Sequence, residues 1–354
     1  MKNGVSKVTV LRWLLLTMVM IAPCVGLQAA EEQPAQEGII DLAWPPKPMP
    51  TRIRYLNTIA SFDDLKREKG FWEKFLELIR GEEQNNQLKP MAVAVDGQGR
   101  MSVADPTAKL VHVYDQKSGD YWVIEEAGDF PLVLPVGLAV DEKSNIYVSD
   151  GGLKKICVFS PKGEYLRSIG GSGQIERPTS IAIDVSRRLL YVVDTPAHVI
   201  KVFNVDDGSF IRTIGKRGRK EGELNFPGYV FIGPKGRIHV NDALNGRIQV
   251  FDHRGKFIDT FGRFGDVTGT FATPKGVAVD SDGNIYVADA GFDNIQIFNS
   301  QGRLLLYFGR PGQAPGEFWT PSGLYIDGKD RLYVADAYNR RVQIFQYVKK
   351  AVKQ

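Results

Sequence analysis

A chain of 354 residues would ordinarily suggest two domains, but all-β propellers and barrels of this length also fold as one. Hydrophobic residues make up 43% and charged residues 24%, as in soluble globular proteins, while 37 glycines and 19 prolines indicate many tight turns. The net charge of +4 excludes the strongly basic field on which nucleic-acid binding relies, so we expect no nucleic-acid partner.

Residues 1–30 have the layout of a secretory signal peptide: three cations, an apolar run over 13–22 and then small residues. This pattern predicts export to the periplasm or another extracytoplasmic space. The alternatives are a lipoprotein signal with Cys24 as the lipidated cysteine, and an uncleaved anchor, for which ten apolar residues are short. Removal of the leader takes away three cations and no acid, so the remaining chain carries +1. Cys157 is then the only cysteine, which excludes an intrachain disulfide.

The next segments include two that lie outside any repeat. Residues 31–50 contain five prolines and predict an extended, proline-rich linker. Residues 62–81 predict a helical insertion, because apolar residues between 71 and 80 recur at helical spacing and Gly81 can end the helix. The sequence leaves open whether this amphipathic helix packs on the chain's own domain or contacts a partner or a membrane surface.

From residue 89 onward one motif occurs six times: a proline, two residues, a short apolar strand, a turn, and an apolar strand that ends in Asp. The prolines are Pro90, Pro135, Pro178, Pro227, Pro274 and Pro321. The aspartates are Asp105, Asp150, Asp194, Asp242, Asp289 and Asp336. Successive aspartates are 44 to 48 residues apart, and each unit has room for four strands. This period is typical of propeller blades, so we predict an all-β, six-bladed β-propeller.

The sixth unit ends after its third strand, which would leave an unpaired sheet edge. Residues 54–60 match the fourth strand at 164–170 position by position. We therefore predict that an N-terminal strand, residues 52–60, completes the sixth blade and closes the ring. The propeller then spans residues 51–348, is expected to be monomeric, and is followed by a tail at 349–354.

A family resemblance rests on the last two units. Tyr-Val-Ala-Asp occurs at 286–289 and 333–336, and each is followed by an apolar strand, 294–298 and 341–345. These motifs resemble NHL repeats, and the weaker units extend the resemblance over most of the chain. The resemblance implies a six-bladed propeller of NHL-type repeats. NHL propellers serve as binding platforms for proteins, RNA or ligands, and the peptide-amidating lyases are a related branch, so the fold alone does not decide the function.

The repeated aspartates are expected to be structural, because they occupy the same place in every unit. There they can cap the loop between the second and third strands through side-chain to backbone hydrogen bonds. The four histidines occupy different places in their units and do not converge: His112, His198, His239 and His253. No motif for a nucleophile or a phosphate-binding loop occurs. We therefore predict no catalytic residue, no metal site and no cofactor.

Function is better sought where one unit departs from the others. Tyr229 stands where five units have a small residue, and Phe231 and Tyr325 replace the alanine found two positions further on in the other four. These side chains are expected beside the propeller axis, where they either line a pocket or plug the channel. The loops around the prolines and aspartates share one face and carry four further candidates: Phe292, Trp319, Tyr338 and Arg340.

Together these features predict an exported, non-catalytic scaffold that holds a protein, peptide or glycan on the loop-rich face of the propeller. The alternative is a metal-assisted lyase or hydrolase with its site at the axis, as the resemblance to the amidating lyases implies. Membrane contact is expected only through a lipid on Cys24 or through the helix at 71–80.

Overall fold

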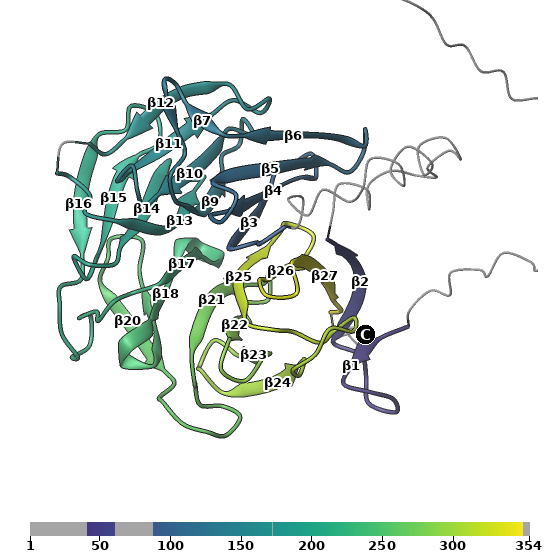
Figure 1. The fold of residues 1–354 in the computed structure, drawn as a ribbon. Coiled ribbons are helices and arrows are strands. Elements are labelled where there is room, and N and C mark those ends of the chain that lie inside the picture. The colour runs from purple at the N-terminus through teal and green to yellow at the C-terminus, as the bar shows by residue number, and fades with distance from the viewer. Residues whose placement is uncertain (1–40, 61–87, 172, 350–354) are drawn as a thin grey trace, which may run out of the picture. The chain divides into compact units, whose positions relative to one another are not determined.

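Short apolar runs separated by glycine and aspartate turns form antiparallel sheets that are arranged around a common axis (Figure 1). The computed structural model describes residues 41–60, 88–171 and 173–349. The expected signal peptide at 1–30 and the expected helical insertion at 62–81 lie outside these residues. Within the described residues, no helix has the length and apolar character needed to cross a membrane.

Each of six sheets forms one blade, in which the strands follow one another from the axis outwards. Blade 1 contains β3 (Ala92–Val95), β4 (Arg100–Asp105), β5 (Leu110–Asp115) and β6 (Asp120–Ile124). Blade 2 contains β9 (Pro135–Val140), β10 (Ile146–Asp150), β11 (Lys155–Phe159) and β12 (Tyr165–Ile169). Blade 3 contains β13 (Pro178–Asp184), β14 (Leu189–Asp194), β15 (Val199–Asn204) and β16 (Phe210–Ile214).

The second half of the ring repeats this order. Blade 4 contains β17 (Tyr229–Ile232), β18 (Ile238–Asp242), β19 (Arg247–Phe251) and β20 (Phe257–Phe261). Blade 5 contains β21 (Pro274–Val279), β22 (Ile285–Asp289), β23 (Asn294–Phe298) and β24 (Leu304–Phe308). Blade 6 contains β25 (Pro321–Ile326), β26 (Arg331–Asp336), β27 (Arg341–Tyr347), β2 (Ile53–Ile59) and β1 (Ala43–Trp44). The connections hold β7 (Glu126–Ala127), β8 (Phe130–Pro131) and the single turns η2 (Pro234–Gly236) and η3 (Ala243–Asn245).

Blade 6 is built from both ends of the described chain. Strand β2 pairs antiparallel with β27, with Ile53 opposite Tyr347 and Ile59 opposite Val342. Strand β1 then adds outside β2, and the Trp44 ring lies 5.1 Å from the ring of Phe308. The expected linker at 31–50 therefore ends earlier than its prolines suggested, because Ala43 and Trp44 already belong to the sheet.

The hydrophobic core lies between neighbouring blades, because both faces of each sheet are covered. Buried residues of blades 5 and 6, for example, form one cluster that includes Tyr286, Leu332 and Phe345. Near the axis the inner strands approach closely: a Cβ added at Gly137 would lie 2.2 Å from the Thr179 carbonyl oxygen, and one at Gly276 would lie 2.4 Å from that of Ser322. This close approach explains why five units have a small residue at this position.

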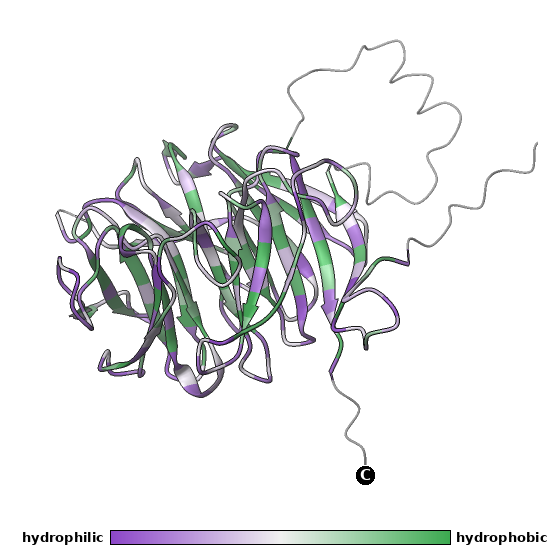
Figure 2. Cartoon of the chain, turned by 90° about the horizontal axis from the view of Figure 1, so that it is seen from below, coloured by the Kyte–Doolittle hydropathy of each residue, from purple (hydrophilic) through white to green (hydrophobic). Residues whose placement is uncertain are grey.

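The antiparallel order divides the connections between two faces. The loops between second and third strands and the connections from one blade to the next form the loop face. The turns between first and second strands and between third and fourth strands form the turn face. Figure 2 shows hydrophobic residues concentrated along the strands and hydrophilic residues in the connections at both faces. The expectation that the proline-led loops and the loops after the aspartates share one face is confirmed by this topology.

The outermost strands share an irregularity in five of the six blades. The pairing between third and fourth strands skips one residue, which forms a β-bulge and leaves its side chain exposed. The skipped residues are Leu56, Leu166, Ile211, Ile258 and Leu305. In blade 1, β5 and β6 pair without interruption from Val111–Ile124 to Asp115–Asp120.

Candidate functional site

The six strand-end aspartates hold the backbone of the loop face in place. Asp289 accepts hydrogen bonds from the N–H groups of Ala272 and Thr273, at 2.8 and 2.9 Å, and from Gly291 at 3.0 Å. In all six blades the aspartate binds an N–H of the segment that leads into the first strand. The expected cap of the loop between the second and third strands is present in blades 1, 2 and 5. The aspartates are therefore structural residues and not a carboxylate site.

One position of the third strand recurs beside the strand-end aspartate, and in blades 1, 3, 4 and 6 its side chain contacts that carboxylate. In blades 4 to 6 it is a glutamine; Gln343 accepts from the Gly316 N–H at 2.8 Å and donates to the Glu317 carbonyl at 2.7 Å. Blades 1 to 3 place His112, Cys157 and Lys201 there. Burial raises the pKa of the Cys157 thiol to about 12, and the nearby Asp150 carboxylate adds to this shift. Cys157 is thus a protonated core thiol and not a nucleophile.

The axial candidates Tyr229, Phe231 and Tyr325 converge at the centre of the ring. The Tyr229 hydroxyl reaches from blade 4 across to the Sδ of Met91, 3.6 Å away, at the entrance to blade 1. The Tyr325 hydroxyl donates a 2.8 Å hydrogen bond to the Val95 carbonyl, and burial raises its pKa to about 12. The rings of Phe231 and Tyr325 meet edge to face with centroids 6.5 Å apart. These rings narrow the channel, as the plug interpretation required.

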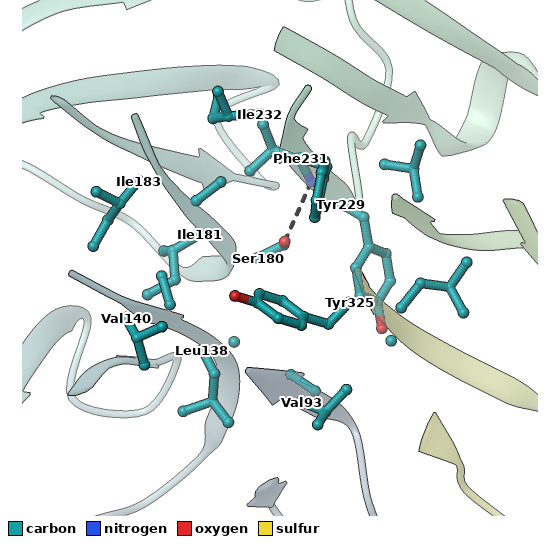
Figure 3. A pocket seen from close by; sticks show the side chains of 18 of the residues that line it. Val93, Leu138, Val140, Ser180, Ile181, Ile183, Tyr229, Phe231, Ile232 and Tyr325 are labelled. Carbon is teal, nitrogen blue, oxygen red and sulfur yellow. Dashed lines mark hydrogen bonds between the residues drawn. The ribbon is translucent and has the colours of Figure 1, made fainter. Parts of the chain in front are cut away.

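The three aromatic rings do not fill the axial channel. A cavity of about 230 Å³ remains beside them and is lined by inner strands of all six blades, chiefly β9, β13 and β17 (Figure 3). Its lining side chains are aliphatic apart from the three aromatic rings and Ser180, and none of them is charged, while polar atoms contribute as much of the exposed wall as apolar atoms do. The axial residues therefore serve as plug and as pocket wall at once.

The loop-face candidates gather where blades 5 and 6 meet. Trp319 is 48% exposed and Tyr338 is 62% exposed, and their rings lie 5.5 Å apart. The Tyr338 N–H also donates to the Trp319 carbonyl at 3.2 Å, so the two loops are joined. Arg340 is exposed on the loop of Tyr338, whereas Phe292 is half-buried. Because the Asp293 carboxylate binds the Thr320 N–H at 2.6 Å, the loop of Phe292 is tied to that of Trp319.

Sequence reasoning missed six exposed apolar residues on the same face. One set lies between blades 1 and 2, and the other lies in loops of blades 4 and 5. They are Phe130, Val133 and Leu134, and Leu244, Phe264 and Val267. The second set borders the exposed basic loop at residues 216–220, which folds around the Glu223 carboxylate. One indication of these exposed residues is present in the sequence: they stand in connections between the expected strands, where the repeat places no core residue.

The histidines remain apart from the axial cavity, whose lining contains no His, Cys, Asp or Glu. His239 is buried in β18; burial lowers its pKa to about 4, so the ring is neutral at pH 7. His198 accepts the Phe226 N–H at its Nδ1, 3.1 Å away, and burial and the nearby Arg217 lower its pKa. Across the described residues, no group of three or more His, Cys, Asp and Glu side chains is placed to hold a metal ion. The metal-assisted alternative therefore has no ligand set in the described part of the chain.

Family models match three stretches of the chain. The NHL repeat model matches residues 271–298 and 318–345, which correspond to blades 5 and 6. A model described as a six-bladed beta-propeller matches residues 129–216. Both descriptions agree with the six sheets and with the motifs on which the resemblance was based.

Known proteins resemble this chain in sequence or in structure at low identity. The chain is 29% identical over 148 residues to "Protein brain tumor" of Drosophila melanogaster, a match that covers 40% of this chain and 13% of the fly protein. A structural genomics protein of unknown function from Bacteroides thetaiotaomicron superposes with a TM-score of 0.60 at 17% identity, over 75% of this chain and 71% of its own. A streptogramin B lyase superposes with a TM-score of 0.56 at 14% identity, over 73% and 94%. At these identities the structural matches establish the fold and no activity.

Proposed function

Because this chain is a six-bladed β-propeller with NHL repeats, we propose that it is a non-catalytic scaffold that holds a protein, peptide or glycan partner against its loop face. The exposed pair of Trp319 and Tyr338 carries this proposal. Two large, exposed aromatic side chains that contact each other on joined loops present an apolar surface, and such side chains dominate binding energies at interfaces.

The surroundings of the pair support the same assignment. Two further sets of exposed apolar residues lie on the same face at other blades, and Arg340 and the basic loop at 216–220 add cations to that face. Aromatic and arginine side chains are enriched in interface cores. The turn face is mostly short turns of Gly, Asp, Asn, Ser and Lys, which offer little apolar area to bury.

Replacing Trp319 or Tyr338 with alanine is expected to weaken binding of the partner about thirtyfold. Truncating an anchoring aromatic costs about 2 kcal/mol or more of binding free energy, and 1.4 kcal/mol is a factor of ten. The partner is first captured with the exported propeller from the native envelope fraction, and its affinity for each variant is then measured by calorimetry. Tyr307→Ala is the matched control, because Tyr307 is 50% exposed but lies on the outer strand β24.

Lys329→Ala, on the turn face, provides a second control. Both controls should leave the affinity unchanged. If the controls abolish binding while the folded Trp319 and Tyr338 variants bind as the parent chain does, the loop face is not the working face.

We also propose that the scaffold is exported without a lipid. The cations and apolar run of residues 1–30 support a cleaved leader, and Pro23 is a poor match to the small residue expected before a lipidated cysteine. The mature chain isolated from the envelope should begin near residue 30 and have the mass of an unmodified polypeptide. An intact mass that shows an acylated Cys24 at the N-terminus would replace this proposal with a lipoprotein.

A further inference from the structure

The axial cavity is separate from the exposed loop-face residues and has its own chemistry. Its volume is about 230 Å³. An engineered aliphatic cavity of about 150 Å³ in another protein binds benzene, so this one has room for a benzene ring with a short substituent. It is smaller than the pockets of roughly 300 Å³ and more that hold drug-sized ligands.

The walls favour a neutral ligand. Their side chains are mostly aliphatic and come from the inner strands of all six blades, beside the rings of Tyr229, Phe231 and Tyr325. No charged side chain among them could pair with an ionised group. A carboxylate or an ammonium group would lose its hydration there without compensation.

Among the polar groups of the wall, the hydroxyl groups of Ser180 and Tyr325 are placed to bind a ligand. The Ser180 Oγ accepts the Val230 N–H at 3.2 Å, and no described residue accepts the hydrogen of this hydroxyl. The Tyr325 hydroxyl donates to the Val95 carbonyl, which leaves its oxygen able to accept. In Figure 3 both hydroxyl groups face the same space. A ligand hydroxyl could therefore accept from Ser180 and donate to Tyr325.

The burial of the lining residues indicates the entrance. At the loop-face end, Ala92 and Gly323 are buried and Val136 is half-buried. None of these residues is exposed, and the Tyr229 hydroxyl closes onto Met91. At the turn-face end, Val140 and Ile183 are only half-buried, and Val185, in the turn after β13, is 45% exposed. The cavity thus opens toward the turn face, opposite the surface assigned to the macromolecular partner.

We propose that the axial cavity binds a small neutral molecule with a hydrocarbon body the size of an alkylbenzene and one hydroxyl group, which enters from the turn face. This proposal is independent of the scaffold role, because the two sites share neither the exposed aromatic pair nor the entrance.

The test compares three probes of one shape by calorimetry on the mature propeller: 4-ethylphenol, ethylbenzene and 4-ethylbenzoate. We expect 4-ethylphenol to bind with a Kd below about 1 mM. Ethylbenzene should bind about tenfold more weakly, because the hydroxyl hydrogen bonds are lost. The carboxylate should not bind at ~5 mM, since its charge would be buried unpaired.

Three variants locate the binding. Val185→Trp narrows the entrance at an exposed position. It should weaken the binding of 4-ethylphenol at least about tenfold, a change in Kd that calorimetry resolves. Leu305→Trp places the same large side chain at an exposed bulge of β24, away from the cavity, and should leave the affinity for 4-ethylphenol unchanged. Tyr325→Phe should reduce the preference for 4-ethylphenol over ethylbenzene.

Absence of binding by both neutral probes, equal binding of all three probes, or unchanged 4-ethylphenol affinity in folded Val185→Trp would each overturn the proposal. None of these results would bear on the Trp319 and Tyr338 variants, which are measured with another ligand.

Discussion

A chain that begins at residue 61 instead of residue 31 is expected to lose its cooperative unfolding transition. It lacks β2, whose Ile53, Tyr55 and Ile59 are buried against β27 and the neighbouring core. Each fully buried large apolar side chain contributes about 2 kcal/mol, so the three together contribute roughly 6 kcal/mol. Whole domains are stable by only about 5–15 kcal/mol, and the deletion also leaves one side of β27 unpaired. Circular dichroism during thermal unfolding measures the effect.

A chain that begins at residue 51 is the matched control, since it keeps β2 and loses only β1 and its approach. It should still unfold cooperatively, with a Tm lower by roughly 5 °C, because it loses the half-buried Trp44 ring beside Phe308 and Phe345. If the chain that begins at residue 61 melts like the control, β2 does not close the ring.

Asp150→Ala is expected to destabilise the propeller by about 4 kcal/mol, which corresponds to a Tm roughly 10 °C lower. The Asp150 carboxylate is fully buried and accepts hydrogen bonds from four backbone N–H groups. The donors are Val133, Leu134, Gly152 and Leu153. Alanine leaves these donors without their acceptor and opens the connection between blades 1 and 2.

The free energy of unfolding of Asp150→Asn should lie between those of the parent chain and Asp150→Ala, because the amide oxygen still accepts from some of the four backbone N–H groups. Asp266→Ala is the matched control, since Asp266 is exposed in a loop on the same face. Urea unfolding of the three variants gives the free energies. A loss below about 1 kcal/mol in Asp150→Ala, the range usual for surface substitutions, would contradict the role assigned to the aspartates.

The fold was predictable because its repeating requirements are local. Every blade needs an acceptor for the backbone N–H groups that lead into its first strand, so the aspartates recur at a fixed spacing. Five of the six inner strands have a small residue where the next one passes, as at Gly137 and Gly276. By contrast, the two-residue strand β1 has no periodicity to detect, and only the packing of Trp44 shows where the linker ends.

The candidate site was less predictable because exposure depends on tertiary packing. Phe292 and Phe130 both stand in connections between strands of the blades, yet Phe292 is half-buried and Phe130 is exposed. Phe264 is exposed although its ring lies against Gly246, where a Cβ would come within 2.7 Å of it. Likewise the sequence showed that Tyr229 is unusually large for its position, but not that its hydroxyl crosses the axis to Met91.

The bulges in the outer strands limit how strands of different copies of this propeller can pair at high concentration. A bulge interrupts the ladder that a strand from another molecule would extend, and in blade 6 β1 also covers the edge of β2 at Ile53 and Arg54. Among the described outer strands, only β6 offers an uninterrupted edge. If only the described strands take part, pairing between two copies would use this one regular edge of each copy and stop at a closed pair, and these strands would leave no second regular edge from which a fibre could grow.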